Sequence, residues 1–311
     1  MNTLRIAVFG SVNIDVTAFC ERLPRPGETV PGRGYSMTLG GKGANQAVAA
    51  ARLGAQSSLI GRTGNDAFGG LARERLGAYG VDLDQLLAQP GAATGVAVIN
   101  VDSQAENAIV VIGGANMTVD TTDVERALPI LTRARVLLLQ LEVPLAATLE
   151  ASARTRAAGG RVILDPAPAP AGGLPSMAYA AADLITPNET ETEALVGVRP
   201  QTQAEAEIAA KRLLARGVST AIIKMGAAGV FYHGPEGAGF VPPFPVRAIN
   251  SVGAGDCFNG GLAVALAQGL VLPDAVRFAA ACGALATTGP GGAASAPAIA
   301  DVDNLLRRGT I

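Results

Sequence analysis

A glycine-rich turn that ends in an aspartate is the segment of this chain whose residue types best suit chemistry. It reads Gly253-Ala254-Gly255-Asp256, and the Ala- and Leu-rich segment after it, 262–270, predicts a helix. The first turn of a helix presents unpaired backbone N–H groups at the positive end of the dipole, where anions bind. A carboxylate there can accept a proton from a hydroxyl while the N–H groups hold developing negative charge. The segment therefore predicts phosphoryl transfer without histidine.

The alternative is an ordinary turn with Asp256 as a plain helix cap, and this segment alone leaves it open. Two common nucleotide motifs are absent. A dinucleotide fingerprint needs G-x-G-x-x-G, but residue 258 is Phe where the third glycine would stand. A P-loop needs Ser or Thr after its lysine, but Gly43 follows Lys42. A nucleotide bound by this chain is therefore held in another way.

The composition restricts the partners and the chemistry. The 311 residues are 49% hydrophobic and 16% charged, and the net charge of −2, with no basic cluster, argues against a nucleic-acid partner. We expect no membrane span, because no apolar run reaches about 18 residues, and no signal peptide, because polar residues come early. Cys20, Cys257 and Cys282 form no disulfide or metal pattern, which favours the cytoplasm. The single histidine, His233, is expected in a solvated loop.

Alternating apolar and amphipathic segments must position these residues. Strands are expected at 4–9, 57–60, 135–140, 161–165, 183–186 and 220–225, and helices at 47–53, 67–79, 123–131, 145–158, 204–216, 256–268 and 273–286. This alternation predicts an α/β fold with a mainly parallel sheet covered on both faces. Segments 28–39, 95–102 and 108–112 predict a second, small sheet, which must cover the substrate as a lid or form a dimer contact.

Polar residues recur where the predicted strands end, and ligands of open α/β sheets bind beyond those ends. They are Asn13, Asp15, Glu142, Asn188 and Glu191. A carboxylate there can hold a metal-bound water beside phosphates. Ordinary loop residues are the alternative, and for Glu191 an acid in the first turn of a helix.

Two further glycine turns could approach a ligand closely. In the turn at 40–46, Lys42 and Asn45 can bond a polyol, although a helix entry with a solvated lysine is the alternative. The turn at 224–229 suits a flat base or a phosphate, and a simple tight turn is its alternative.

In this order the motifs closely resemble those of the ribokinase-like (phosphofructokinase B) carbohydrate kinases, nearly from end to end. The matching segments are G-S-V-N-I-D at 10–15, P-G-E-T-V at 26–30, G-G-K-G-A-N-Q-A at 40–47, Q-L-E at 140–142, D-P-A-P-A at 165–169, T-P-N-E-T-E at 186–191 and G-A-G-D-C-F-N-G at 253–260. The last is a specific family signature. The resemblance implies one three-layer α/β/α domain over residues 1–311, with a small β lid from about 16–39 and 94–113.

The resemblance also implies an activity, its cofactors and a partner. The activity is ATP-dependent phosphorylation of a sugar's primary hydroxyl. The G-G-K-G-A-N-Q form is similar to the members that convert D-ribose to D-ribose 5-phosphate. Another pentose, deoxyribose, a ketohexose or a nucleoside is the alternative substrate, and a binding regulator without turnover is the alternative class. Mg²⁺ is implied as cofactor, K⁺ as activator, and a homodimer through the lid as assembly.

The family roles transfer to numbered positions of this chain. Asp256 is the catalytic base, and the backbone of Gly253, Ala254 and Gly255 is the anion hole. Sugar-binding positions are Asn13, Asp15, Gly41, Lys42, Asn45, Glu142 and Asp256. Nucleotide-binding positions are Asn188, Lys224, Gly226, Gly229 and Gly255, and Glu191 orients Mg²⁺ through water. The monovalent-cation positions are Asn250, Val252, Gly292 and Ser295. The family usually carries Asp at position 250, so Asn250 implies weaker potassium dependence.

Overall fold

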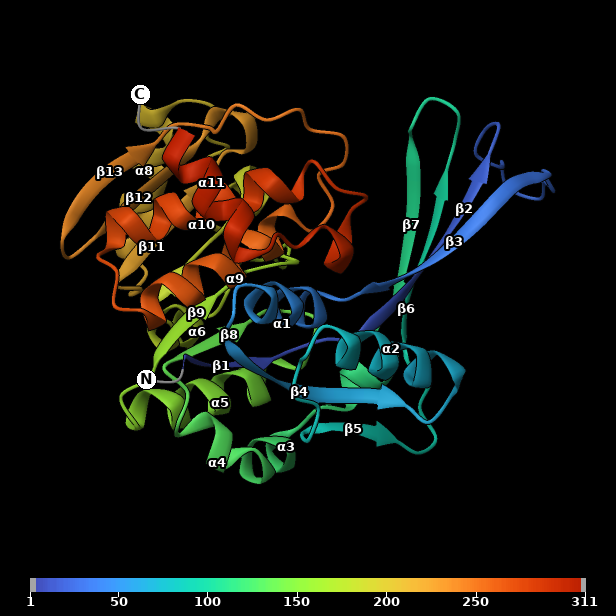
Figure 1. Ribbon diagram of the computed structural model, residues 1–311, viewed down its shortest axis with the longest axis horizontal. Coiled ribbons are helices and arrows are strands. Elements are labelled where there is room, and N and C mark those ends of the chain that lie inside the picture. The colour runs from blue at the N-terminus through green and yellow to red at the C-terminus, as the bar shows by residue number, and fades with distance from the viewer. Residues whose placement is uncertain (1–3, 309–311) are drawn as a thin grey trace.

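The computed structural model describes residues 4–308 and contains a large and a small sheet (Figure 1). The large sheet has nine strands in the order β13-β12-β11-β10-β9-β8-β1-β4-β5. Their bounds are β1 Arg5–Phe9, β4 Gln56–Gly64, β5 Leu86–Gln89, β8 Val136–Leu139, β9 Arg161–Leu164, β10 Leu184–Ile185, β11 Thr220–Lys224, β12 Val230–Gly234 and β13 Gly237–Val241. Neighbours from β11 to β5 pair in parallel, and only β12 and β13 are antiparallel. The expected mainly parallel sheet is confirmed.

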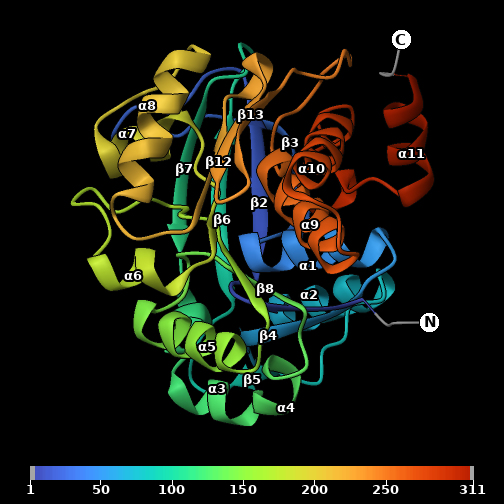
Figure 2. The same ribbon diagram turned by 90° about the vertical axis from the view of Figure 1, so that its left-hand side faces the viewer.

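Helices cover both faces of the large sheet, so the expected three-layer fold is confirmed (Figure 2). One face carries α1 Lys42–Arg52, α2 Ala67–Ala78, α9 Ala254–Ala267, α10 Leu272–Ala286 and α11 Ile299–Arg308. The other carries α3 Thr121–Arg126, α4 Leu128–Leu131, α5 Leu145–Ala157, α6 Ser176–Ala181, α7 Glu189–Val196 and α8 Gln203–Leu214. Because strand side chains alternate, Ile6 and Val8 of β1 enter one core and Ala7 and Phe9 the other. Between residues 4 and 308 every helix is too short or too polar to cross a bilayer.

The small sheet extends away from the main body (Figure 1). Its order is β3-β2-β6-β7, with bounds β2 Asn13–Cys20, β3 Gly32–Gly40, β6 Gly95–Val101 and β7 Asn107–Ile112. The expected hairpin at 95–102 and 108–112 is confirmed as β6 and β7. However, β2 begins earlier than the expected lid, so Asn13 and Asp15 are strand residues. The reason is backbone pairing, which joins them to Gly40 and Thr38 of β3.

Several boundaries differ from the sequence predictions. Helix α1 begins at Lys42, five residues before the expected start, because Gly41 takes a left-handed φ of 86° at its N-cap. The helix expected at 123–131 is split into α3 and α4 near Pro129, which has no N–H to continue the ladder. His233 does not lie in a loop but in β12, half-buried and paired with Ala221.

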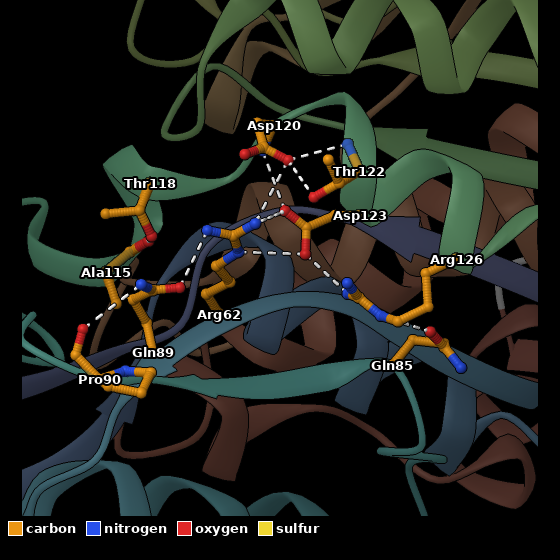
Figure 3. Close-up of polar contacts among 10 residues, drawn as sticks. All are labelled: Arg62, Gln85, Gln89, Pro90, Ala115, Thr118, Asp120, Thr122, Asp123 and Arg126. Atoms are coloured by element: carbon orange, nitrogen blue, oxygen red, sulfur yellow. Dashed lines mark hydrogen bonds and ion pairs between the residues drawn. The ribbon is translucent and has the colours of Figure 1, made fainter.

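A buried ion-pair cluster ties α3 to the β4–β5 edge of the large sheet (Figure 3). The carboxylate of Asp123 is fully buried, and its oxygens lie 2.7 Å from Nη2 of Arg62 and 2.6 Å from Nη2 of Arg126. It also accepts a hydrogen bond from the backbone N–H of Asp120, which completes the capping box of α3. Arg62 in turn donates to Gln89 of β5. Each charge has partners, so the cluster stabilises this edge as a unit.

Candidate active site

The carboxylate of Asp256 lies buried in the first turn of α9, with 6% of the residue exposed. The turn before it is possible because Gly253, the N-cap, has a φ of 82°. A Cβ on Gly253 would also lie 3.0 Å from the Cα of Gly292. Glycine is therefore required at 253 both by the backbone angle and by the close approach of a second turn.

The N-terminus of α9 leaves backbone donors free for an anion. Gly253 offers no side chain to cap the helix, and among the first N–H groups only that of Ala254 has an acceptor within residues 4–308, the carbonyl of Ser251. The N–H groups of Gly255 and Asp256 belong to the first turn, which has no intrahelical acceptor for them. A Cβ on Gly255 would stand 3.4 Å from Nζ of Lys224, so this glycine keeps space open between the helix end and a cation.

Helix α1 orients the Asp256 carboxylate. Asn45 donates from Nδ2 to one oxygen at 2.9 Å, and Gln46 donates from Nε2 to the other at 3.1 Å. The amide of Gln46 is fixed in turn, because its Oε1 accepts a bond of 2.7 Å from Gln140. The sequence prediction included Asn45 but missed Gln46 and Gln140, although both lie within the quoted family segments.

Burial raises the pKa of Asp256 to about 6. Repulsion from Asp165 adds to this rise, whereas the attraction of Lys42 lowers the pKa. The bonds from Asn45 and Gln46 favour the ionised form but do not cancel the cost of burial. Asp256 is thus a stronger base than an ordinary aspartate and is still mostly ionised at neutral pH.

Asp165 is a second buried carboxylate that the sequence prediction missed as a site residue. Gln46 donates to its Oδ2 at 2.9 Å, using the same Nε2 group that bonds Asp256. Nζ of Lys224, at the end of β11, lies 3.2 Å from its other oxygen. Gln46 and Asp165 therefore link Asp256 to the lysine beside the helix terminus.

Asp15 of β2 and Glu142, beyond β8, form an acidic cluster next to Asp256. Burial raises the pKa of Asp15 to about 6, and repulsion from Glu142 and Asp256 adds to the rise. Glu142 accepts from the Ser11 hydroxyl at 2.5 Å and from the backbone N–H of Lys42 at 2.9 Å. A Cβ at Gly40 or Gly41 would collide with the β2 segment, so these glycines let α1 and β2 approach.

Lys42 and Asn13 lie beside this acidic cluster. Burial would lower the pKa of Lys42, but Asp256, Asp165, Glu142 and Glu191 together raise it, so the ammonium stays charged. Oδ1 of Asn13 accepts a bond of 2.7 Å from Asn116, a buried residue absent from the sequence prediction. Acidic oxygens, a cation and amides thus lie close together, as recognition of a polyol requires.

The phosphate side is built on α7 and β11. Asn188 and Glu191 form a reciprocal capping box: Glu191 accepts from the N–H of Asn188 at 2.8 Å and from its Nδ2 at 2.9 Å. Burial raises the pKa of Glu191, while Lys224 acts in the opposite direction. Gly226 is exposed at the turn, whereas a Cβ on Gly229 would collide with Val241, so Gly229 has a packing role.

The four residues expected to hold a monovalent cation are brought together, but an oxygen of Asn250, of Val252 and of Ser295 already accepts a protein hydrogen bond. Oδ1 of Asn250 accepts from the N–H of Val252 at 2.9 Å, the carbonyl of Val252 from Gly292 at 2.9 Å, and Oγ of Ser295 from Gly291 at 2.5 Å. Nδ2 of Asn250 donates to the carbonyl of Pro290 at 2.6 Å. The Nδ2 donor of Asn250, and not an oxygen that could bind a cation, therefore faces the carbonyl of Pro290.

Comparisons with known proteins agree with this geometry. The family model described as "pfkB family carbohydrate kinase" matches residues 3–299. A ribokinase of Haemophilus influenzae is 37% identical over 292 residues, which cover 94% of this chain and 95% of the relative. A deoxyribokinase of Salmonella typhi is 34% identical over 302 residues, which cover 97% and 98%. A solved structure of Arabidopsis thaliana ribokinase, described as complexed with ribose and ATP, superposes with a TM-score of 0.91 at 32% identity, covering 98% of this chain and 99% of that one.

Proposed function

Because the chain belongs to the pfkB family of carbohydrate kinases, we propose that it transfers the γ-phosphoryl group of ATP to the primary 5-hydroxyl of D-ribose. The products are D-ribose 5-phosphate and ADP. The observation that carries the proposal is the buried Asp256 carboxylate in the first turn of a helix that no side chain caps. The relatives named ribokinase, and the plant structure described with ribose and ATP, support the choice of substrate and nucleotide.

In this proposal Asp256 is the general base. A primary alcohol is a far weaker acid than a carboxylic acid, so Asp256 takes the proton as the O–P bond forms rather than before. The bond from phosphorus to the bridging oxygen of ADP breaks in the same step. Asn45 and Gln46 hold both carboxylate oxygens, so the base needs no reorientation, and positioning contributes much of the rate.

The transferring group would lie at the N-terminus of α9. The N–H groups of Gly255 and Asp256 and the helix dipole favour negative charge there, whereas the N–H of Ala254, expected in the anion hole, bonds the carbonyl of Ser251. Lys224 adds a cation on the side that Gly255 leaves open, and an isolated parallel β-bridge places Asn188, the N-cap of α7, next to Lys224. We assign the nucleotide phosphates to this side, with the turn at Gly226 and Gly229 toward the base.

The sugar would bind at the acidic cluster of Asp15, Glu142 and Asp256. A carboxylate accepts two hydrogen bonds at once, so Asp15 suits two neighbouring hydroxyls. Lys42, Asn45 and Glu142, together with the Gly41 backbone, can hold the remaining hydroxyls, while the amide of Asn13 donates from its free side. The small sheet carries Asp15 and Asn13 on β2, so closure of that sheet would bring both to the sugar.

We propose that Mg²⁺ arrives with ATP and is oriented through water by Glu191. Between residues 4 and 308 no cluster of three or more His, Cys, Asp or Glu side chains could hold a metal. The ion would therefore take its direct ligands from phosphates and water, which is the usual arrangement for Mg²⁺. When bound, it neutralises phosphate charge. Glu191 fits this role because it is buried, close to Lys224 and held by Asn188.

We further propose that the small sheet forms a homodimer. All six residues of β7 are exposed, and Ile109, Val110, Val111 and Ile112 are between 50% and 62% exposed. An apolar edge strand without cover is a strong candidate for association. Sedimentation should give a dimer that Val110→Lys dissociates, while Ile208→Lys on the far helix α8, also exposed, should not. A monomeric parent protein would refute this assembly.

The activity is tested by ADP production with Mg·ATP across ribose, deoxyribose, fructose and nucleosides. Ribose should give the highest kcat/KM. Deoxyribose is the second candidate, supported by the 34% identical deoxyribokinase. A site that bonds a hydroxyl rejects a substrate lacking it by up to about 10⁴-fold, so the panel separates the two. If none of these acceptors produces ADP, the protein is a binding regulator rather than a kinase.

A further inference from the structure

Two turns pack against each other directly behind the N-terminus of α9. We call them the paired turns, residues 249–253 and 287–292. The backbone N–H of Gly292 donates to the carbonyl of Val252, and those of Ile249 and Asn250 donate to the carbonyl of Thr287. Gly253, whose backbone begins the anion hole, touches Gly292 closely. The position of the hole therefore depends on how the paired turns are joined.

The side chain of Asn250, in the first turn, also joins the paired turns. Oδ1 accepts from the N–H of Val252 in its own turn, and Nδ2 donates to the carbonyl of Pro290 in the other. Only this orientation works, because Val252 offers a donor and Pro290 an acceptor. Reversing the amide would set two donors together at one end and two acceptors together at the other.

A carboxylate at this position would behave differently. One oxygen could still accept from Val252, but the other would face the carbonyl oxygen of Pro290 at the distance where Nδ2 now lies, 2.6 Å. Two oxygens that close repel unless a positive charge lies between them. The Asn250 N–H group supplies that positive end from within the chain. A cation added here would instead meet the hydrogens of Nδ2.

We propose that the side-chain amide of Asn250 replaces a monovalent cation in joining the paired turns, so that turnover in this chain does not require potassium. The proposal rests on the proposed kinase function for its rate measurement, but not for its stability measurement. Asn250 acts on the reaction only as a positioning residue, since it touches the turn behind the anion hole and not the reacting atoms.

The experiment compares the parent protein with Asn250→Asp in KCl and in N-methylglucamine chloride of equal ionic strength, which removes general screening as a cause. The parent should show the same kcat in both salts, and its Tm should be the same. In the potassium-free salt Asn250→Asp should lose about tenfold in kcat, and KCl should restore at least about fivefold. KCl should also raise the Tm of this variant by at least about 2 °C.

Two controls separate the bridge from other effects. Asn250→Ala removes both bonds without adding a carboxylate, so KCl should restore neither its rate nor its Tm. Gln203→Glu makes the same change from amide to carboxylate on exposed α8, across the sheet, and should behave as the parent does. More than about fivefold activation of the parent by KCl overturns the proposal, and so does an Asn250→Asp variant whose Tm ignores KCl. If the parent phosphorylates no sugar, the Tm series still decides the inference, while the proposed function alone fails.

Discussion

Replacing Asp256 by Asn should abolish most turnover and at the same time stabilise the protein. The kinetic loss follows from removing the base, and kcat should fall by at least about 10²-fold with sugar binding largely intact. The stability gain follows from burial, which raises the pKa of this carboxyl from 3.8 to about 6. The folded state therefore binds the proton more tightly than the unfolded chain does. The ionised side chain weakens the fold progressively as the pH rises from 3.8 through 6.

The magnitude follows from the two pKa values. A difference of about 2 pKa units, at about 1.4 kcal/mol each, makes ionised Asp256 cost the fold about 3 kcal/mol at pH 8. The neutral amide avoids this cost, and its NH₂ group can find a partner. Within the described chain Oδ1 of Asn45 is buried without a hydrogen bond, so turning the Asn45 amide would let it accept from the new side chain. For 311 residues, about 3 kcal/mol corresponds to a Tm rise of about 4–5 °C.

Thermal unfolding at pH 8 and pH 5 measures this effect. The difference between variant and parent should shrink by about half at pH 5, because the parent carboxyl is then largely protonated in the fold. Asp123→Asn is the matched control, since Asp123 is equally buried but paired with Arg62 and Arg126. Breaking that cluster should instead cost about 3–5 kcal/mol. A Tm of Asp256→Asn that is equal to or below the parent's at pH 8 would refute the electrostatic reasoning, and near-normal turnover would refute the role as base.

Three further outcomes test the site. Below pH 6 the kcat/KM for the sugar should fall with a slope that approaches about tenfold per pH unit, and more steeply if Asp15 must also be ionised, because the pKa of each carboxyl is raised to about 6. Glu191→Gln should raise the Mg²⁺ concentration needed for half-maximal rate by about tenfold, with an unchanged KM for the sugar, and an unchanged Mg²⁺ titration would remove Glu191 from the ion's surroundings. Lys224→Met should raise the KM for ATP by about 10–100-fold while the KM for the sugar changes little; an unaltered KM for ATP would place the phosphates elsewhere.

The parts of the fold that the sequence predicts well are those with strong local signals. The segment 4–9 and the helix that begins near Asp256 are continuous apolar runs, and both lie close to their expected bounds. The segments missed entirely include β5, β12, β13, α6 and α11. Most of them are short, so tertiary contacts decide their structure, whereas α11 is amphipathic and could have been predicted from its pattern. The early start of β2 likewise depends on β3, which lies more than ten residues further along the chain.

The candidate site shows a similar division. The glycine turn and Asp256 could be found from local chemistry, because a helix start, two glycines and an acid stand together in the sequence. Gln46, Gln140 and Asp165 could not, because each acts through a partner far along the chain. The bond from Gln46 to Asp256 spans 210 positions and the bond to Asp165 spans 119. No local pattern distinguishes such a residue from an ordinary helix glutamine.

These distant bonds also explain how one site can keep several buried carboxylates beside one another. Each of Asp256 and Asp165 accepts from the single Nε2 group of Gln46, so a neutral donor lies between two like charges. Lys224 stabilises Asp165 from the phosphate side, and Lys42 attracts both carboxylates from the sugar side. Burial nevertheless raises the pKa of Asp256, and the attraction of Lys42 does not restore its ordinary value. The same burial that makes Asp256 a stronger base also makes its ionised form costly to the fold.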